Sequence, residues 1–343
     1  MADSKPRARV QVIRSPSPPS SPELAEAELV EISDVDPLAP LEDDATEIDL
    51  VHCRLSAIPP SLSRFAGLKR LCVRQNQLAE IPADLFPADG VLEELDTYDN
   101  KLKNDTVDLL LSSPQMKNLR TLDLSFNLIK AVPPTISSLS SLETVYFVQN
   151  KISKIGTELS ACTRLRSLEL GGNRIRDLAA LPSLPALEEL WLGKNKITSL
   201  APLKDIALPK LRILSIQSNR ITKIEALPPS LEELYLSHNG VEVLEGLEVA
   251  PGLTTVDIGA NFITEVKPEA VAHLGKIEEL WMNNNKIESL PQTLKALEPL
   301  KTLNTVYLEG NPCQATEGAA YRRKIILTLP WLEQVDATFV VKK

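Results

Sequence analysis

The chain has 343 residues, of which 43% are hydrophobic and only 4% are aromatic, so its core must be built from aliphatic side chains. The net charge of −9 and the isoelectric point near 5.1 argue against nonspecific binding to nucleic acid, which needs a cationic surface. No apolar stretch approaches the ~18 residues of a membrane span, and the N-terminus lacks the apolar segment of a signal peptide. The four scattered cysteines predict a reduced intracellular protein rather than a disulfide scaffold.

Residues 1–43 differ in composition from the rest of the chain. Ten acidic residues, without any lysine or arginine among them, lie between Glu23 and Glu47. Few apolar groups and one dominant charge cannot offset the entropy cost of ordering a backbone, so we predict that 1–43 is a disordered tail. Three serines that precede prolines are candidate sites for a proline-directed kinase, with an unmodified solvating tail as the alternative: Ser15, Ser17 and Ser21.

From residue 44 onward a repeating pattern, L-x-x-L-x-L-x-x-N-x-L, dominates the sequence. Its mean period of about 23 residues falls in the range of leucine-rich repeats. Cys53 takes the asparagine position of the first unit, and because a thiol bonds weakly we expect the first turn to be the loosest. The asparagines of the later units stand at positions 76, 100, 127, 150, 173, 195, 219, 239, 261, 285 and 311.

This pattern predicts an α/β fold, a leucine-rich-repeat solenoid or horseshoe of about twelve repeats. In the unit at 187–197 the side chains of Leu190 and Leu192 are expected in the core. Trp191 must then face outward, because alternate strand residues point to opposite sides. The strands of successive units would stack as a parallel sheet on the concave side, with short 3-10 or helical segments on the convex side. The longest unit has room for a true helix near 107–111.

The repeat positions also predict the boundaries of the solenoid. We place it at 44–312, followed by a C-terminal cap at 313–343, because the ends of a solenoid expose core and need cover. The amphipathic segment 321–332 can close the C-terminal end, whereas the N-terminal end has only 38–41. The amide of each repeat asparagine is expected to satisfy backbone groups of the bend after the strand.

Function on such a scaffold must be inferred from the outward positions of the strands. One outward position per unit lies between the two central apolar residues, and it collects acidic and aromatic side chains without any lysine or arginine. A preference of aromatics for strands would not place them in the solvent-facing position. In order, these residues are Asp49, Cys72, Asp96, Asp123, Tyr146, Glu169, Trp191, Ser215, Tyr235, Asp257, Trp281 and Tyr307.

Exposed rings framed by carboxylates are typical anchors of a protein interface, and the carboxylates favour a partner with basic side chains. A neighbouring outward position strengthens the negative field with Glu94, Glu189, Glu233 and Glu279. Proteins that stack single-stranded nucleic acid on aromatics need a positive groove beside them, so we exclude nucleic acid as the ligand.

The sequence contains no recognisable catalytic constellation. Of the three histidines, His52 and His273 are isolated, and His238 near a repeat turn is interpreted as an exposed polar residue rather than a partner of Asp257. No nucleophile elbow, phosphate-binding glycine loop or metal-ligand spacing occurs, so we predict neither an enzyme nor a cofactor.

Several segments resemble the nuclear leucine-rich-repeat regulatory subunits of protein phosphatase 1, over nearly all of 44–343. The match extends to positions that the fold does not require. It is carried by LDLSFNL at 122–128, NKISKI at 150–155, LELGGNRIR at 168–176, LGKNKIT at 192–198, QSNRITKIE at 217–225, ELYLSHNG at 233–240, VYLEGNP at 306–312, YRRK at 321–324 and DATFV at 336–340.

The resemblance implies a non-catalytic subunit, monomeric on its own, that holds the phosphatase catalytic subunit on its concave face. It also implies ternary complexes with a small phosphatase inhibitor protein, a role in phosphatase maturation and mitosis, and a location in nucleus and cytoplasm. The family's acidic and aromatic strand residues match Asp123, Tyr146, Glu169, Trp191, Glu279, Trp281 and Tyr307; with Tyr235 and Asp257 of the same outward position, these are the predicted partner-binding residues.

Two features depart from the family pattern. The widespread phosphatase docking motif is not met, because RARVQV at 7–12 ends in valine where an aromatic residue is needed. The first two units, with Cys53 and Cys72, match less well. The alternative function is a leucine-rich-repeat scaffold of a spliceosomal ribonucleoprotein, which would hold an RNA-recognition-domain protein instead of a phosphatase.

Overall fold

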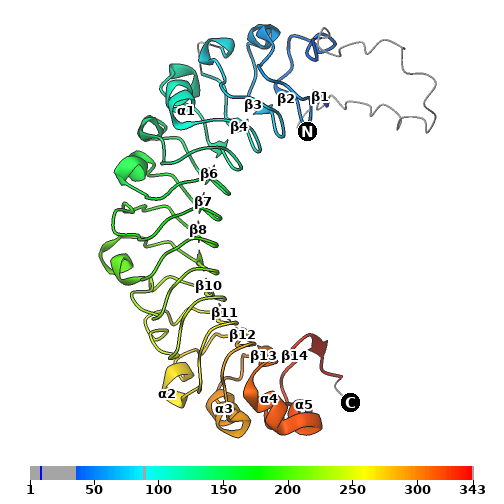
Figure 1. The fold of residues 1–343 in the computed structure, drawn as a ribbon, viewed down its shortest axis with the longest axis vertical. Helices are drawn as coiled ribbons and strands as arrows, with labels where there is room; N and C mark the ends of the chain where they lie inside the picture. Colours follow the sequence, from blue (N-terminus) through cyan, green and yellow to red (C-terminus); the bar gives the residue numbers. More distant parts are fainter. Residues whose placement is uncertain (1–7, 10–35, 88–89, 342–343) are drawn as a thin grey trace, which may run out of the picture.

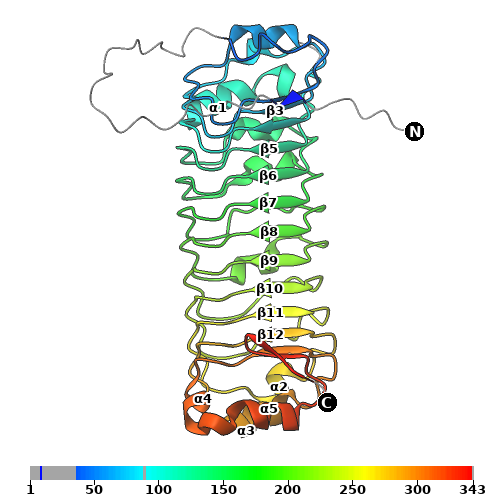
Figure 2. The same cartoon turned by 90° about the vertical axis from the view of Figure 1, so that its right-hand side faces the viewer.

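The computed structural model describes residues 8–9, 36–87 and 90–341, and these form the predicted horseshoe (Figure 1). One strand per repeat lines the concave side, and the strands stack in chain order into a single sheet (Figure 2). The described strands are β1 Ala8–Arg9, β2 Glu47–Asp49, β3 Arg70–Cys72, β4 Glu94–Asp96, β5 Thr121–Asp123, β6 Thr144–Tyr146, β7 Ser167–Glu169, β8 Glu189–Trp191, β9 Ile213–Ser215, β10 Glu233–Tyr235, β11 Thr255–Asp257, β12 Glu279–Trp281, β13 Thr305–Tyr307, β14 Gln334–Val335 and β15 Thr338–Phe339.

Short helices occupy much of the convex side. The helix expected near 107–111 is present as α1, which begins three residues earlier than predicted. The α-helices are α1 Asn104–Leu111, α2 Pro268–Val271, α3 Leu290–Leu297, α4 Pro312–Glu317 and α5 Tyr321–Thr328. The 3-10 segments are η2 Pro60–Arg64, η3 Ala83–Leu85, η4 Pro114–Met116, η5 Pro134–Ser138, η6 Thr157–Ala161, η7 Ala201–Asp205 and η8 Gly318–Ala320. Within the described ranges no helix combines the length and apolarity needed to span a membrane.

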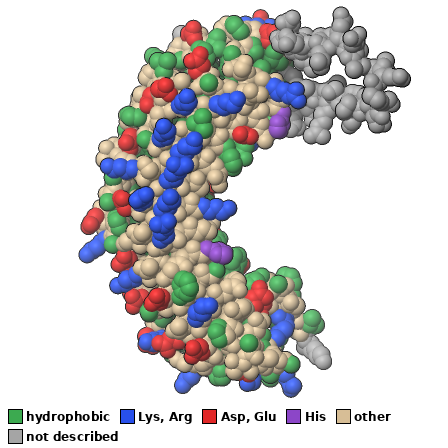
Figure 3. All heavy atoms as spheres, viewed as in Figure 1, with side chains coloured by type: hydrophobic (Ala, Val, Ile, Leu, Met, Phe, Trp, Pro, Cys, Tyr) green, Lys and Arg blue, Asp and Glu red, His purple; other side chains and the backbone are tan. Residues whose placement is uncertain are grey.

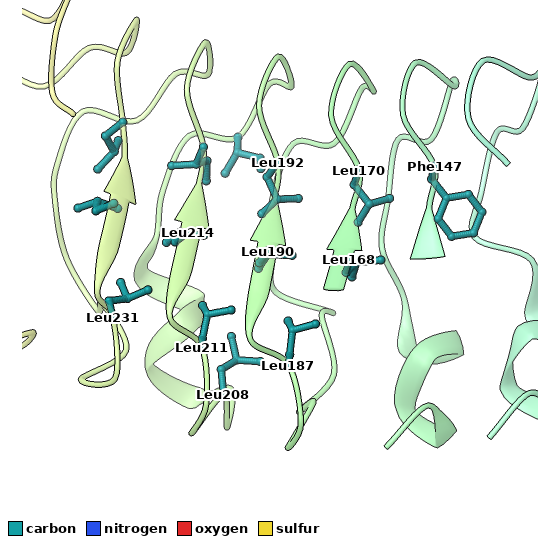
Figure 4. Packing of buried hydrophobic residues seen from close by; sticks show 14 of the residues in the cluster. Phe147, Leu168, Leu170, Leu187, Leu190, Leu192, Leu208, Leu211, Leu214 and Leu231 are labelled. Atoms are coloured by element: carbon teal, nitrogen blue, oxygen red, sulfur yellow. The ribbon is translucent and has the colours of Figure 1, made fainter. Parts of the chain in front are cut away.

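The core is one continuous aliphatic column between the sheet and the convex segments (Figure 4). Leu190 and Leu192, predicted to be inward, are fully buried, as are the equivalent Leu168 and Leu170 of the preceding repeat. Each repeat therefore buries its apolar side chains against the next repeat rather than against a separate layer. This is why the stack needs covered ends.

The repeat asparagines satisfy the bends as predicted. Asn173 Nδ2 donates to the carbonyl oxygens of Phe147, Leu170 and Gly171, at 2.8, 3.0 and 3.3 Å, and its Oδ1 accepts from the amide of Ile152 at 3.0 Å. The amide thus joins its own turn to the preceding repeat. The residue before each asparagine is in the left-handed region, with glycine there only at positions 172 and 310.

Both ends of the core are covered. At the C-terminal end, Tyr321, Ile325, Leu329 and Leu332 are buried, in agreement with the predicted cap. At the N-terminal end, the predicted disordered tail is wrong for residues 36–43, because these residues form turns. Leu38 is fully buried, and the Arg64 guanidinium donates to the carbonyl oxygens of Leu38 and Leu41 at 2.5 and 2.7 Å. The remaining tail residues 1–7 and 10–35 lie outside the described structure.

Replacing a ladder asparagine should destabilise the solenoid. Asn173→Ala leaves the buried Ile152 amide without its acceptor and removes one of the two donors to each of three carbonyls, so we expect the free energy of unfolding to fall by about 1–3 kcal/mol. Urea denaturation followed by circular dichroism measures the change. The matched control is Asn283→Ala, an outward asparagine, which should change stability by less than about 0.5 kcal/mol. Equal losses in both variants would contradict the role given to the ladder.

At Cys53 an asparagine can be introduced instead of removed, because the first repeat lacks the ladder asparagine. The Cys53 thiol reaches only the Val51 carbonyl, at 3.6 Å, where each later repeat has an amide with several bonds. Cys53→Asn should therefore raise the free energy of unfolding by about 1 kcal/mol, through bonds to the carbonyls of Leu50 and Val51. The same urea titration tests this, and a loss of stability would show that the first turn does not accept an amide.

Candidate protein-interaction surface

The predicted outward residues lie in one line along the concave sheet, which we call the central column. Strand pairing from β2 to β13 is parallel throughout, and in every pair the central-column residue of one strand is the register partner of the next, as for Trp191 with Ser215 and Trp281 with Tyr307. Eight of the nine predicted partner-binding residues belong to this column, and their side chains are half-buried on the inner wall. Their common placement is confirmed.

The ninth, Glu279, belongs to a second outward column two residues earlier in each strand. This upstream column also contains Glu94, Glu189 and Glu233, in register with one another through the same strand pairs. Carboxylates from the two columns therefore lie side by side on the concave face. The predicted negative surface is present, and it adjoins the aromatic rings.

At the N-terminal end of the column the chain neutralises its own acids. Arg70 donates to Asp49 at 2.7 Å and to Glu94 at 2.9 Å. Asp96 is buried and faces Arg74 at 3.4 Å. The acidic groups available to a partner are therefore concentrated from β5 onward, where the predicted site begins.

Two rings in the middle of the column form a pair above a small residue. Trp191 and Tyr235 are stacked, with centroids 6.4 Å apart and planes 18° apart, and Ser215 occupies the strand between them. Trp191 Nε1 donates to Glu189 at 3.3 Å, and the Tyr235 hydroxyl donates to Glu233 at 2.7 Å. Each ring is thus oriented by the carboxylate two residues before it, which reduces the freedom lost on binding.

A second ring pair lies near the C-terminal cap. Trp281 and Tyr307 have centroids 5.7 Å apart and planes 58° apart. Gln334 of the cap donates to the Tyr307 hydroxyl at 2.7 Å. The indole nitrogen of Trp281 is shielded from solvent and has no hydrogen-bond partner within the described residues.

Between β5 and β7, burial and neighbouring carboxylates raise the proton affinity of Glu169 and Tyr146. Burial, and then the neighbouring Asp123 carboxylate, raise the pKa of Glu169. Burial also raises the pKa of Tyr146, followed by the charges of Glu169 and Asp123, so its hydroxyl stays neutral and can donate. A cation placed here would relieve the repulsion between the carboxylates. The site is therefore electrostatically suited to lysine or arginine side chains.

Other features of the site were not anticipated from the sequence. Tyr98 and Phe126 form a ring contact at 4.8 Å, with Arg74 4.3 Å from the Tyr98 ring, and none of these stands in the central column. The orienting bond from Gln334 was also missed, since the cap carries no repeat signature. His238 is exposed, as interpreted from the sequence, and the described residues contain no cluster of potential metal ligands. The candidate phosphorylation sites lie outside the described residues: Ser15, Ser17 and Ser21.

Comparisons with known proteins agree with this geometry. A family model described as "Leucine Rich repeats (2 copies)" matches residues 163–205 and 185–229, and one described as "Leucine rich repeat" matches 117–175 and 251–312. A solved leucine-rich-repeat protein of Leptospira interrogans superposes with a TM-score of 0.63 at 25% identity, over 82% of this chain and 75% of that one. The chain is a leucine-rich-repeat solenoid.

Three curated relatives share parts of this solenoid. Podocan-like protein 1 of Mus musculus is 30% identical over 83% of the chain and 52% of its own length. The protein phosphatase 1 regulatory inhibitor subunit PPP1R7 homolog of Arabidopsis thaliana is 36% identical over 44% of the chain and 45% of its own length. The protein phosphatase 1 regulatory subunit SDS22 of Schizosaccharomyces pombe is 47% identical over 21% of the chain and 22% of its own length. The solenoid spans about half the length of the first relatives it matches.

The proton affinity of Glu169 gives a direct test of this surface. We expect NMR titration of its carboxyl carbon to give a midpoint above the ordinary glutamate value of about 4.3. Because the folded pKa exceeds the unfolded pKa, the group's ionisation lowers the free energy of unfolding as pH rises between those two values. Asp123→Asn should lower the midpoint without fully restoring the ordinary value, since burial persists.

The control for this titration is Asp49→Asn, which removes a carboxylate already paired with Arg70 in β3. It should leave the Glu169 midpoint unchanged. A midpoint at or below the ordinary value in the parent chain would refute the buried acidic environment described for β5–β7.

Proposed function

We propose that the solenoid is a non-catalytic regulatory subunit that binds the catalytic subunit of protein phosphatase 1 on its concave face. The single observation that carries the proposal is the register of the central column, which gathers five of the chain's rings and its carboxylates on one wall. Two regulatory subunits of protein phosphatase 1 are among the curated relatives, each over part of the chain. The resemblance in 122–340 extends the same assignment to the individual strand residues.

Recognition in this proposal is steric and electrostatic. The ring pairs Trp191–Tyr235 and Trp281–Tyr307 are anchors that enter the partner's surface, each ring contributing ~2 kcal/mol or more on truncation to alanine. Carboxylates such as Glu169 meet basic side chains and accelerate the encounter through the long-range negative field.

The proposal assigns no chemical step to this chain. Regulation would come from occupying or positioning the phosphatase, and a small inhibitor protein would join as a third component. We place the complex in nucleus and cytoplasm, as the resemblance implies. The chain alone should show no turnover of phosphorylated substrates. Capture of an RNA-recognition-domain protein in place of the phosphatase would favour the ribonucleoprotein scaffold instead.

Removing the anchors should strongly weaken binding without unfolding the solenoid. We expect Trp281→Ala, and separately the double variant Glu169→Ala with Trp191→Ala, to weaken binding of the phosphatase catalytic subunit at least 30-fold, on the order of 2 kcal/mol. Isothermal titration calorimetry with the purified catalytic subunit measures the affinity. Circular dichroism checks that the fold is retained, since all three side chains lie outside the core.

The matched control is Phe262→Ala, which removes an aromatic ring that is 52% exposed outside the two outward columns. Its affinity for the phosphatase should stay within about twofold of the parent chain. Parent-like affinity of the concave variants would discredit the site, and a failure of the parent chain to bind would discredit the function.

A further inference from the structure

A second row of charged residues runs along the edge where the chain leaves each strand. From Asn76 to Asn285, the residue after each repeat asparagine donates its amide to a carbonyl of the preceding repeat. Lys151 donates to Ile129 at 2.7 Å and Arg174 to Ile152 at 2.7 Å, and the next two repeats continue the ladder. These bonds place four cations on four consecutive repeats, in a set we call the basic row: Lys151, Arg174, Lys196 and Arg220.

The basic row is unpaired. Among the described residues, none of its four side chains forms an ion pair. Arg176 and Lys194, both exposed, add cations on the same repeats. Figure 3 shows lysine and arginine side chains gathered in a band along the flank of the middle repeats. The row is bounded by Leu128 before it and Gly240 after it.

At the opposite edge, where the chain enters each strand, charged residues on neighbouring repeats form ion pairs at the same repeat spacing. There cations and anions alternate from repeat to repeat, linked by the same kind of backbone ladder. Lys69 pairs with Glu93 at 3.3 Å, and the alternation continues through later repeats. We call this set the paired edge: Lys69, Glu93, Arg120, Glu143, Arg166, Glu188, Arg212 and Glu232.

The contrast between the two edges indicates a partner for the basic row. Like charges at the same position of neighbouring repeats repel and destabilise the fold, whereas charges that alternate in sign stabilise it slightly. The chain has a net charge of −9, so acidic residues are abundant, yet in the part of the chain that the structure describes none forms an ion pair with these cations. The cations of the basic row repel one another and so destabilise the fold slightly. A partner that carries acidic side chains would relieve this repulsion on binding.

We propose that the basic row binds an acidic, extended polypeptide segment of a partner protein. Three repeat steps of ~4.8 Å span about 14 Å, which roughly five extended residues would cover. Such a segment needs three or four aspartate or glutamate side chains to match the four cations. The row residues include no aromatic ring on which a base could stack, so a polypeptide fits better than a nucleic acid.

This site is separate from the proposed phosphatase surface, because it lies on the edge of the solenoid and not in the outward columns. The inference therefore does not depend on the proposed function. A chain with both surfaces would bring a basic partner and an acidic partner together on one rigid frame.

Anisotropy of a fluorescent eight-residue oligoglutamate peptide tests the basic row. We expect the parent chain to bind it at low salt, and a variant with K151Q, R174Q, K196Q and R220Q to bind at least tenfold more weakly. A second variant with only K196Q and R220Q should show an intermediate loss. Circular dichroism confirms the fold of each, and the melting temperature of the fourfold variant at low salt should not decrease, since repulsion is removed.

The matched control neutralises the four cations of the paired edge, with K69Q, R120Q, R166Q and R212Q, and so changes the net charge equally. It should bind the peptide within about twofold of the parent. Equal losses of peptide affinity in the two fourfold variants would show that binding depends only on net charge and would overturn the proposal. Absence of binding by the parent chain, or tighter row-dependent binding of an eight-nucleotide oligothymidylate, would overturn it as well.

Discussion

From β3 to β13, the bend after each strand is closed by one asparagine amide, and the rest of the solenoid depends on this set of bonds. The amide donates to carbonyls of its own turn and of the preceding repeat, and its oxygen accepts from a third backbone group, as Asn173 shows. A single side chain therefore satisfies buried polar groups and fixes the position of one repeat on another. The exact register of the sheet follows, since a slip of one residue would leave several of these groups without partners.

The register of the strands then determines the surface that a partner meets. Residues at the same position of successive repeats lie side by side and form a line along the solenoid. The central column gathers rings and carboxylates on the concave wall, with Trp191 and Tyr235 held by Glu189 and Glu233. The paired edge uses the same spacing to neutralise charge, and the basic row uses it to accumulate charge. The three lines share one backbone geometry and differ only in which residue each repeat contributes.

Much of this arrangement could be predicted from the sequence. The period identified the solenoid, and strand alternation placed Trp281 and Tyr307 outward and in line, because both constraints are geometric and local. The bond between Gln334 and Tyr307 could not be predicted, since it joins a cap without repeat signature to the last repeat. Nor could the neutralisation of Asp49 by Arg70, which depends on side-chain conformations. Residues 36–43 have the acidic composition of a tail, but the buried Leu38 and the hydrogen bonds from Arg64 hold them against the first repeats.

The cap and the last ring pair share their supports. Asp336 accepts from the amides of Leu308 and Glu309, at 2.8 and 2.9 Å, and its own carbonyl oxygen accepts from Gln334, which in turn donates to Tyr307. Fraying at this end would release an anchor of the concave face before any neighbouring repeat opened. Local order at the C-terminal margin is therefore coupled to recognition, and a partner seated on Tyr307 would in return hold the cap closed.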